Sequence, residues 1–397
     1  MIKNLIIKNN INRTSLSKEE KKLKKIIEEF QYLINVKKDA LHTISKNFKL
    51  NFKHSELKKF NKFKNIIVIG MGGSILGSKA IYTYLKKKIK KNFIFIDNLD
   101  STKLNLVKKK IKFKKSCFII ISKSGNTLET LVNSNLLNNK INSKNSIIIT
   151  EKKKNLLKTY SIKKNIQFIE HKSYLGGRYS VLSEVGMVPA ILMGLNINSF
   201  RKNLLTYLHK KKSLLMDSVI KLTSIYKAKK INSLVFLNYA PELDDFLYWC
   251  QQLIAESLGK KGKGLTPLVS SAPRDHHSLM QLYLDGPKDK LFVVFSSSQE
   301  EKIKTNVNIF DKMFNYAQGK DFSKIRVAQR KALLQELKNK KIPHREFEVN
   351  KLNEETLGEL FSYFILETVL VGKLLKINPY DQPGVENVKI LTKKYLT

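Results

Sequence analysis

Two loops in the first third of the chain have residue types suited to binding an anion. The first is the segment GMGGSILG, residues 70–77, which follows a β-branched apolar run and opens a helical segment. Glycines let a ligand approach the backbone, and a helix N-terminus offers free N–H groups to an anion. The spacing fits neither the G-x-G-x-x-G fingerprint nor a P-loop, and a tight strand–helix turn explains it equally well.

The second loop, SKSGNT at residues 122–127, is more specific. It also follows an apolar run and precedes a helical segment, and it places Ser122, Ser124 and Thr127 around Lys123. Hydroxyl and N–H groups give directional hydrogen bonds to a phosphate monoester, and the ammonium and helix dipole add charge. Helix capping alone needs one hydroxyl, so we favour a phosphate site.

An arginine could stabilise an oxyanion, and a glutamate could serve as a general base. Arg178 follows two glycines in GGRYS, residues 176–180, in a chain where arginine is scarce. Its guanidinium can stabilise an oxyanion. The alternative is an arginine that is merely exposed in a turn. Glu256 lies in the last turn of a helix that we expect to end at Gly259, where the helix dipole favours proton binding and suits a general base. A surface glutamate is the alternative.

Two later segments carry further candidates. Asp275, His276 and His277 could suggest a metal site, but no further ligand set is evident. We interpret one histidine as a proton shuttle and its neighbour as structural. In DQPGVENVK, residues 381–389, a Pro-Gly turn separates Gln382 from Lys389, which without context is a surface lysine.

The elements that must position these residues alternate between strand and helix. Short apolar runs of high β-propensity are separated by helical segments and cover residues 65–70, 92–97, 117–121, 146–150, 167–170, 233–240, 290–298 and 343–349. Near-continuous apolar strands indicate mostly parallel sheets that are covered on both faces. The fold class is therefore α/β, with two tandem three-layer α/β/α sandwich domains and helical arms at both ends. In open sheets of this kind, ligands bind beyond the carboxyl ends of the strands, where both loops lie.

The domain boundaries follow from this pattern. We expect an N-terminal helical arm at 1–50, with a helix over 17–48, and a first α/β domain at 51–200. A second α/β domain should occupy 201–376, ending in a long apolar helix over 354–376. A C-terminal segment at 377–397, helical over 385–395, would complete the site.

Charge and cysteine content limit the other classes. Lys and Arg number 74 and Asp and Glu 33, a net charge of +41 over 397 residues. The lysines are scattered along the chain, which makes a nucleic-acid face the least favoured interpretation. Cys117 and Cys250 sit in apolar stretches and imply no disulfide framework. With no signal-peptide pattern and no run of about 18 apolar residues, we expect a cytoplasmic protein without membrane contact.

Taken in order, these segments resemble the glucose-6-phosphate isomerase family over about residues 66–389. GMGGSILG, SKSGNTLET, GGRYSVLSEVG, AESLGK, HHSLMQLYLDG and DQPGVENVK are each similar to a family motif. The resemblance implies two sugar-isomerase domains, no metal or other cofactor, and a homodimer. It implies interconversion of glucose 6-phosphate and fructose 6-phosphate through ring opening and a cis-enediolate, a step of glycolysis and gluconeogenesis. The phosphate loop also resembles that of dual phosphoglucose/phosphomannose isomerases, and a non-catalytic sugar-phosphate-binding protein on this fold is a further alternative.

The resemblance also implies roles residue by residue. Glu256 would be the base between C2 and C1, and Arg178 would stabilise the enediolate oxygen. His277 would assist ring opening from the partner subunit, a task shared with Lys389. Sugar contacts would come from Gly73, Ser74 and Gln382, and phosphate contacts from Ser122, Lys123, Ser124 and Thr127.

Overall fold

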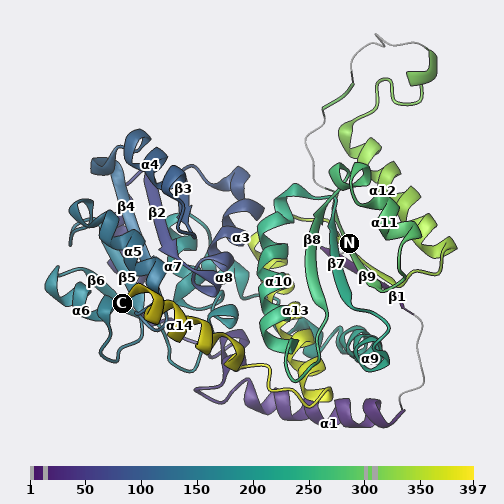
Figure 1. Cartoon of the computed structure of the whole chain (residues 1–397), viewed down its shortest axis with the longest axis horizontal. Coiled ribbons are helices and arrows are strands. Elements are labelled where there is room, and N and C mark those ends of the chain that lie inside the picture. The colour runs from purple at the N-terminus through teal and green to yellow at the C-terminus, as the bar shows by residue number, and fades with distance from the viewer. Residues whose placement is uncertain (1–3, 12–16, 299–302, 306–311) are drawn as a thin grey trace.

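The computed structural model describes residues 4–11, 17–298, 303–305 and 312–397. They form two α/β lobes that lie side by side, each built around a five-stranded sheet (Figure 1). The α/β class with mostly parallel sheets, predicted from the alternating pattern, is confirmed.

All strands of the first sheet are parallel, and their order is β3-β2-β4-β5-β6. Their bounds are β2 Asn65–Gly70, β3 Asn92–Ile96, β4 Ser116–Ile121, β5 Ser146–Thr150 and β6 Gln167–Glu170. The associated helices are α3 Leu76–Tyr84, α4 Ser101–Lys110, α5 Leu128–Leu136, α6 Leu156–Lys163 and α7 Glu184–Leu192. Alternate residues of a strand point to opposite faces, so Ile66 and Val68 join the large central core, whereas Ile67 and Ile69 pack toward α4 and α6.

The second sheet has the order β1-β10-β9-β7-β8, with only β1 antiparallel to its neighbour. Its strands are β1 Leu5–Asn10, β7 Ser233–Asn238, β8 Thr266–Ser271, β9 Lys290–Ser297 and β10 His344–Val349. Its helices are α9 Lys212–Ala228, α10 Asp244–Leu258, α11 Met280–Asp285, α12 Phe322–Asn339 and α13 Glu354–Leu374. Strands β1 and β8 were not predicted from the sequence. Both are edge strands, β1 with a polar second half and β8 with Pro267, so neither carries a continuous apolar run.

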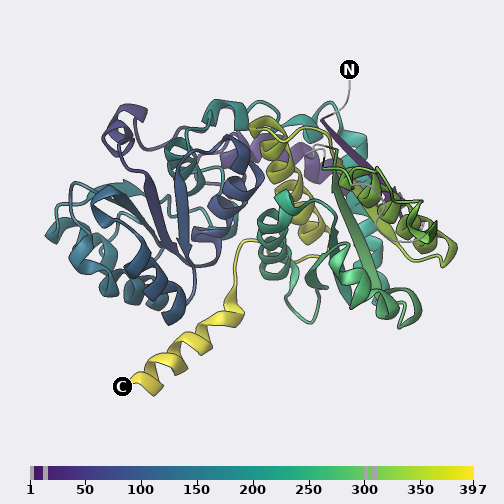
Figure 2. The ribbon, with the colours of Figure 1, turned by 90° about the horizontal axis from the view of Figure 1, so that it is seen from above.

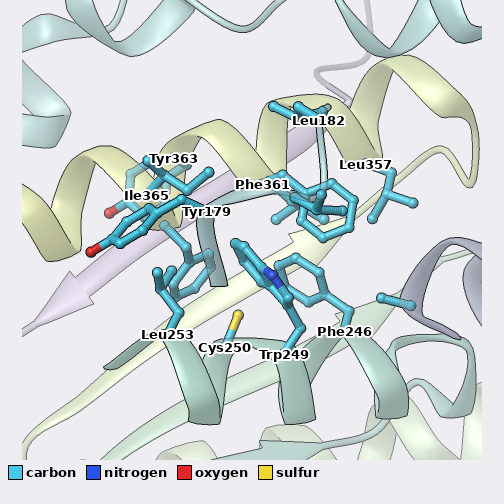
Figure 3. Packing of buried hydrophobic residues seen from close by; sticks show 14 of the residues in the cluster. Tyr179, Leu182, Phe246, Trp249, Cys250, Leu253, Leu357, Phe361, Tyr363 and Ile365 are labelled. Carbon is cyan, nitrogen blue, oxygen red and sulfur yellow. The ribbon is translucent and has the colours of Figure 1, made fainter. Parts of the chain in front are cut away.

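Helices α10 and α13 form the core between the two sheets. Figure 3 shows Phe246 and Trp249 of α10 facing Phe361 of α13, and the Trp249 and Phe361 rings are 4.8 Å apart at their centroids. Tyr179 and Leu182, which follow the first sheet, belong to the same cluster. Because α10 also packs along α3 of the first domain, its last turn lies at the junction of the domains.

The N-terminal arm is less helical than the pattern predicts. Helix α1 spans Ser17–Leu33, and the chain then forms a 3-10 turn at Ala40–Ile44 and the short α2 at His54–Leu57. The predicted continuation to residue 48 is therefore wrong. Lys38 has a φ of 77°, which a helix cannot contain. Leu23, Ile27 and Phe30 of α1 are fully buried in the central core.

The C-terminal helix α14, Glu386–Leu396, extends away from both lobes (Figure 2). Every side chain from Asp381 to Thr397 is exposed.

The short helix α8, Ile197–Phe200, follows α7 in the chain. The domain boundaries at 50, 200 and 376 stay predictions. Within the described parts of the chain, no helix combines the length and apolar character needed to cross a bilayer.

Candidate active site

Arg178 is a buried guanidinium at the junction of the two domains, with only 2% of its surface exposed. Its Nε donates to Ser257 Oγ at 2.9 Å, and its Nη2 donates to the carbonyl oxygens of Pro379 and Asp381 at 2.7 and 2.9 Å. Its Nη1 faces Glu256 Oε2 at 3.1 Å. These acceptors fix the plane of the guanidinium, so the charge is preorganised beside the carboxylate.

Glu256 lies in the last turn of α10 with about a third of its side chain exposed, at 31%. Gln252, one turn earlier on the same helix face, donates from Nε2 to Glu256 Oε1 at 2.9 Å. Both carboxylate oxygens are therefore oriented, one by Gln252 and the other by Arg178. The exposed part leaves room for a reacting group to approach.

The glycine loop after β2 closes against this pair. Gly73 packs so tightly that an added Cβ would lie 2.2 Å from the carbonyl carbon of Gly177 and 2.5 Å from Arg178 N. Gly72 has a φ of 51°, and a Cβ added there would lie 2.8 Å from Gln252 Nε2, so the missing side chain leaves space for Gln252. Ser74 follows in the same 3-10 turn and is buried. Only glycine permits this approach, which brings the first loop to Arg178.

The SKSGNT loop follows β4, the strand beside β2 in the sheet. Strand β3 lies on the other side of β2, so the strand order of this parallel sheet reverses between β2 and β4, which is where ligands bind in open α/β sheets. Ser122 Oγ and Thr127 Oγ1 are 2.8 Å apart, and Ser124 Oγ accepts from Asn126 N at 3.2 Å. Helix α5 begins directly after Thr127, so the positive end of its dipole faces the loop.

Lys123 adds a cation to this loop. Burial lowers the pKa of its ammonium; Glu151, at 3.9 Å, opposes that effect, while the charges of Lys153 and Arg178 reinforce it. Deeper in the same region, burial lowers the pKa of His171 to about 4, so its imidazole is neutral at pH 7.

The sequence as a whole matches known proteins over most of its length. The family model described as phosphoglucose isomerase matches residues 34–397. The chain belongs to the phosphoglucose isomerase family.

Relatives in this family include enzymes from an archaeon and a bacterium. The glucose-6-phosphate isomerase of Methanocaldococcus jannaschii is 35% identical over 349 residues, covering 84% of each chain. That of Campylobacter jejuni is 33% identical over 359 residues, covering 84% of this chain and 85% of the relative.

Solved structures share the fold. A hypothetical protein from Thermus thermophilus superposes with a TM-score of 0.84 at 21% identity, covering 96% of each chain. A glucose-6-phosphate isomerase from Chlamydia trachomatis superposes with a TM-score of 0.79 at 17% identity, covering 100% of this chain and 89% of that one. Family membership and fold thus agree with the motifs in the sequence.

The predicted site residues form two groups, one around Arg178 and Glu256 and one in the loop after β4, and His277 and Lys389 belong to neither. Gln382 accepts from Arg178 Nη1 at 3.2 Å, which joins the C-terminal segment to the Arg178–Glu256 pair. Lys389 instead lies on the projecting α14, 62% exposed, and pairs with Glu386 at 2.7 Å. His277 is exposed, and no hydrogen bond or ion pair among the described residues links it to Glu256 or Arg178.

The turn that carries His277 is nevertheless well ordered by its neighbours. Asp275 accepts from Ser271 N at 2.8 Å and from Ser270 Oγ at 2.9 Å, and Arg274 Nε donates to it at 3.0 Å. Burial disfavours the charged form of Asp275, but these hydrogen bonds outweigh it and lower its pKa. His276 Nε2 is 2.6 Å from Tyr239 Oη, within hydrogen-bond distance. Among the described residues, no three His, Cys, Asp or Glu side chains cluster so as to hold a metal ion.

Several residues that shape the site were not predicted from the sequence. Gln252 orients Glu256, Ser257 orients Arg178, and the carbonyl groups of Pro379 and Asp381 complete the guanidinium shell. The four-residue spacing of Gln252 and Glu256 on one helix was a usable signal. The carbonyl groups of Pro379 and Asp381 gave no signal in the sequence, because every residue type has a backbone carbonyl.

Proposed function

We propose that this protein is a glucose-6-phosphate isomerase that interconverts glucose 6-phosphate and fructose 6-phosphate. The observation that carries the proposal is the pairing of Glu256 with the buried Arg178, in a chain of the phosphoglucose isomerase family. Aldose–ketose exchange needs one base at carbon and one fixed cation at oxygen, and this pair offers both.

In the proposed reaction, Glu256 removes the proton from C2 of the open-chain aldose and returns it to C1. The electron pair of the broken C2–H bond forms the C1=C2 bond of a cis-enediolate, and the negative charge that develops on O1 is stabilised by Arg178. The hydroxyl proton of O2 passes to O1, and the C2 carbonyl forms as C1 is protonated. Because hydrogen bonds already hold the guanidinium, it does not have to reorganise as charge develops. Gly73, Ser74 and Gln382 line the same junction and would contact the sugar hydroxyls.

The phosphate of the substrate would bind to Ser122, Lys123, Ser124 and Thr127. Binding energy from this remote group holds the reacting carbons against Glu256, so that it contributes to the rate as well as to affinity. The substrate would therefore bind with its phosphate at the SKSGNT loop and its reacting carbons at the domain junction.

Ring opening needs a separate acid and base, for which we propose His277 and Lys389. Since His277 is exposed within its own chain, we propose a homodimer in which it completes the site of the other subunit. Lys389 would act once α14, which buries none of its residues, folds toward the junction. We also infer a cytoplasmic location, which the free thiols of Cys117 and Cys250 support.

The test is a coupled assay on the purified chain, in which glucose 6-phosphate formed from fructose 6-phosphate is oxidised by a dehydrogenase. We expect turnover of about 10–1,000 per second. Mannose 6-phosphate in a parallel assay distinguishes a dual phosphoglucose/phosphomannose isomerase. Tight binding of hexose phosphates without turnover would instead indicate the sugar-phosphate-binding alternative and overturn the proposal.

A further inference from the structure

The turn that joins β5 to α6, residues 150–157, packs along the phosphate loop. Glu151 N and Thr150 Oγ1 both donate to Lys123 O, at 3.1 and 3.2 Å. Leu157 N donates to Gly125 O at 3.1 Å. The carbonyl groups of Lys123 and Gly125 are therefore held toward this turn.

Asn155 is the side chain that organises the turn, and it is 6% exposed. Its Nδ2 donates to Glu151 O at 3.2 Å and to Lys153 O at 2.9 Å, which closes the turn on itself. Its Oδ1 accepts from Lys158 N at 2.9 Å and so caps α6. One amide thus fixes both the turn and the start of the helix.

The same side chain fills the space over Gly125. A Cβ on Gly125 would lie 1.8 Å from Asn155 Oδ1, and Gly125 has a φ of 69°. The phosphate loop and the Asn155 amide are therefore complementary in shape. Neither can move toward the other.

The hydrogen bonds from Glu151 N and Thr150 Oγ1 to Lys123 O determine which way the Lys123–Ser124 peptide points. In a trans peptide the C=O and the following N–H point in opposite directions. Because Lys123 O is directed to the turn, the N–H of Ser124 is directed away from the turn. A phosphate needs N–H groups turned outward in this way.

We propose that Asn155 is a positioning residue for the phosphate loop. Through the turn it holds Lys123 O and Gly125 O away from the ligand, and it fixes the outward N–H of Ser124 before the substrate arrives. The proposal rests on the proposed function for the identity of the substrate, but the loop geometry applies to any phosphate monoester.

The experiment compares Asn155→Ala with the unaltered full chain. We expect the KM for glucose 6-phosphate to rise about 5–30-fold with kcat within about twofold, as for lost binding common to ground and transition states. The Kd for inorganic phosphate, measured by calorimetry, should rise by a similar factor. An unchanged KM together with an unchanged phosphate Kd overturns the proposal.

Two further variants separate positioning from helix capping. Asn155→Ser keeps a capping oxygen but is too short to donate to Glu151 O and Lys153 O, so its KM should stay raised. Full recovery of KM in that variant would show that only the cap matters. Asn353→Ala is the matched control: it removes the equivalent cap of α13, at 2.9 Å to Thr356 N, and should lower stability with no change in KM.

The phosphate measurement keeps this proposal separate from the proposed function. If the unaltered chain turns over no hexose phosphate, the proposed function fails. The Kd for inorganic phosphate still decides the role of Asn155 in that case.

Discussion

Arg178 and Glu256 come from different domains and meet with 3.1 Å between Nη1 and Oε2. Arg178 belongs to the 3-10 turn Gly177–Tyr179 that follows the first sheet, and Glu256 to α10 of the second domain. Any loosening of the packing between the domains would therefore separate base from cation. Activity and domain packing are coupled at this one contact.

Replacing the base tests the chemical step directly. Glu256→Gln keeps the shape of the side chain and its contact with Gln252 but cannot accept a proton, so kcat should fall at least about 1,000-fold. Steady-state assays with fructose 6-phosphate measure kcat and KM. Glu336→Gln, an exposed change on α12, should leave both unchanged. Near-normal turnover of the Glu256 variant would remove that residue from the base role.

The phosphate loop should contribute mainly to binding. Ser124→Ala with Thr127→Ala removes two hydroxyls and the 2.8 Å contact of Thr127 with Ser122, so KM should rise about 10–100-fold. Thr102→Ala, on the exposed face of α4, is the control. If KM were the same in the double variant and the control, these hydroxyls would not bind the phosphate.

A shared site can be tested by mixing inactive variants. Glu256→Gln and His277→Ala subunits, each nearly inactive alone, should regain activity when they are unfolded and refolded together. In a mixed dimer, one site would receive the intact His277 of one chain and the intact Glu256 of the other. The assay is the recovered rate against separately refolded samples. Absence of recovery, with mixed dimers verified by mass, would argue that each chain uses its own histidine.

The role of Lys389 depends on movement of α14. Lys389→Ala should lower kcat about 10-fold with ring-closed substrate, because a proton donor for ring opening is lost. Lys393→Ala, on the same exposed helix, is the matched control and should act as the unaltered chain. Equal rates for the two variants would indicate that α14 does not reach the site.

Breaking the buried Arg345–Glu367 ion pair of the second domain should lower the free energy of unfolding strongly. Arg345 donates to Glu367 at 2.6 and 3.1 Å and also holds Asn9 of β1, at 2.9 Å. Arg345→Met leaves the Glu367 carboxylate buried and unpaired, at a cost of about 3–5 kcal/mol. Arg345→Met with Glu367→Leu should recover most of that loss. Urea denaturation measures the free energy of unfolding of both variants. If Arg345→Met were as stable as the unaltered chain, the prediction would be contradicted.

Much of the fold could be predicted because parallel sheets covered on both faces need continuous apolar strands. Runs such as NIIVIG and SIIIT therefore identified the strands from sequence alone. The edge strands β1 and β8 were missed because an edge strand needs no such run. The extent of α1 was misjudged because the apolar spacing continues past Leu33 while the backbone turns.

The residue types of the site were decided by the sequence, since hydroxyls, an arginine and a lone glutamate after predicted strands or at a helix end already indicate phosphate binding and proton transfer. Their distances were decided by the tertiary structure. Arg178 and Glu256 are separated by a domain boundary, and only the packing of α10 against α3 brings them into contact. The carbonyl groups that hold Arg178, and the Asn155 amide over Gly125, depend on how the backbone is folded, and spacing along a chain does not specify that.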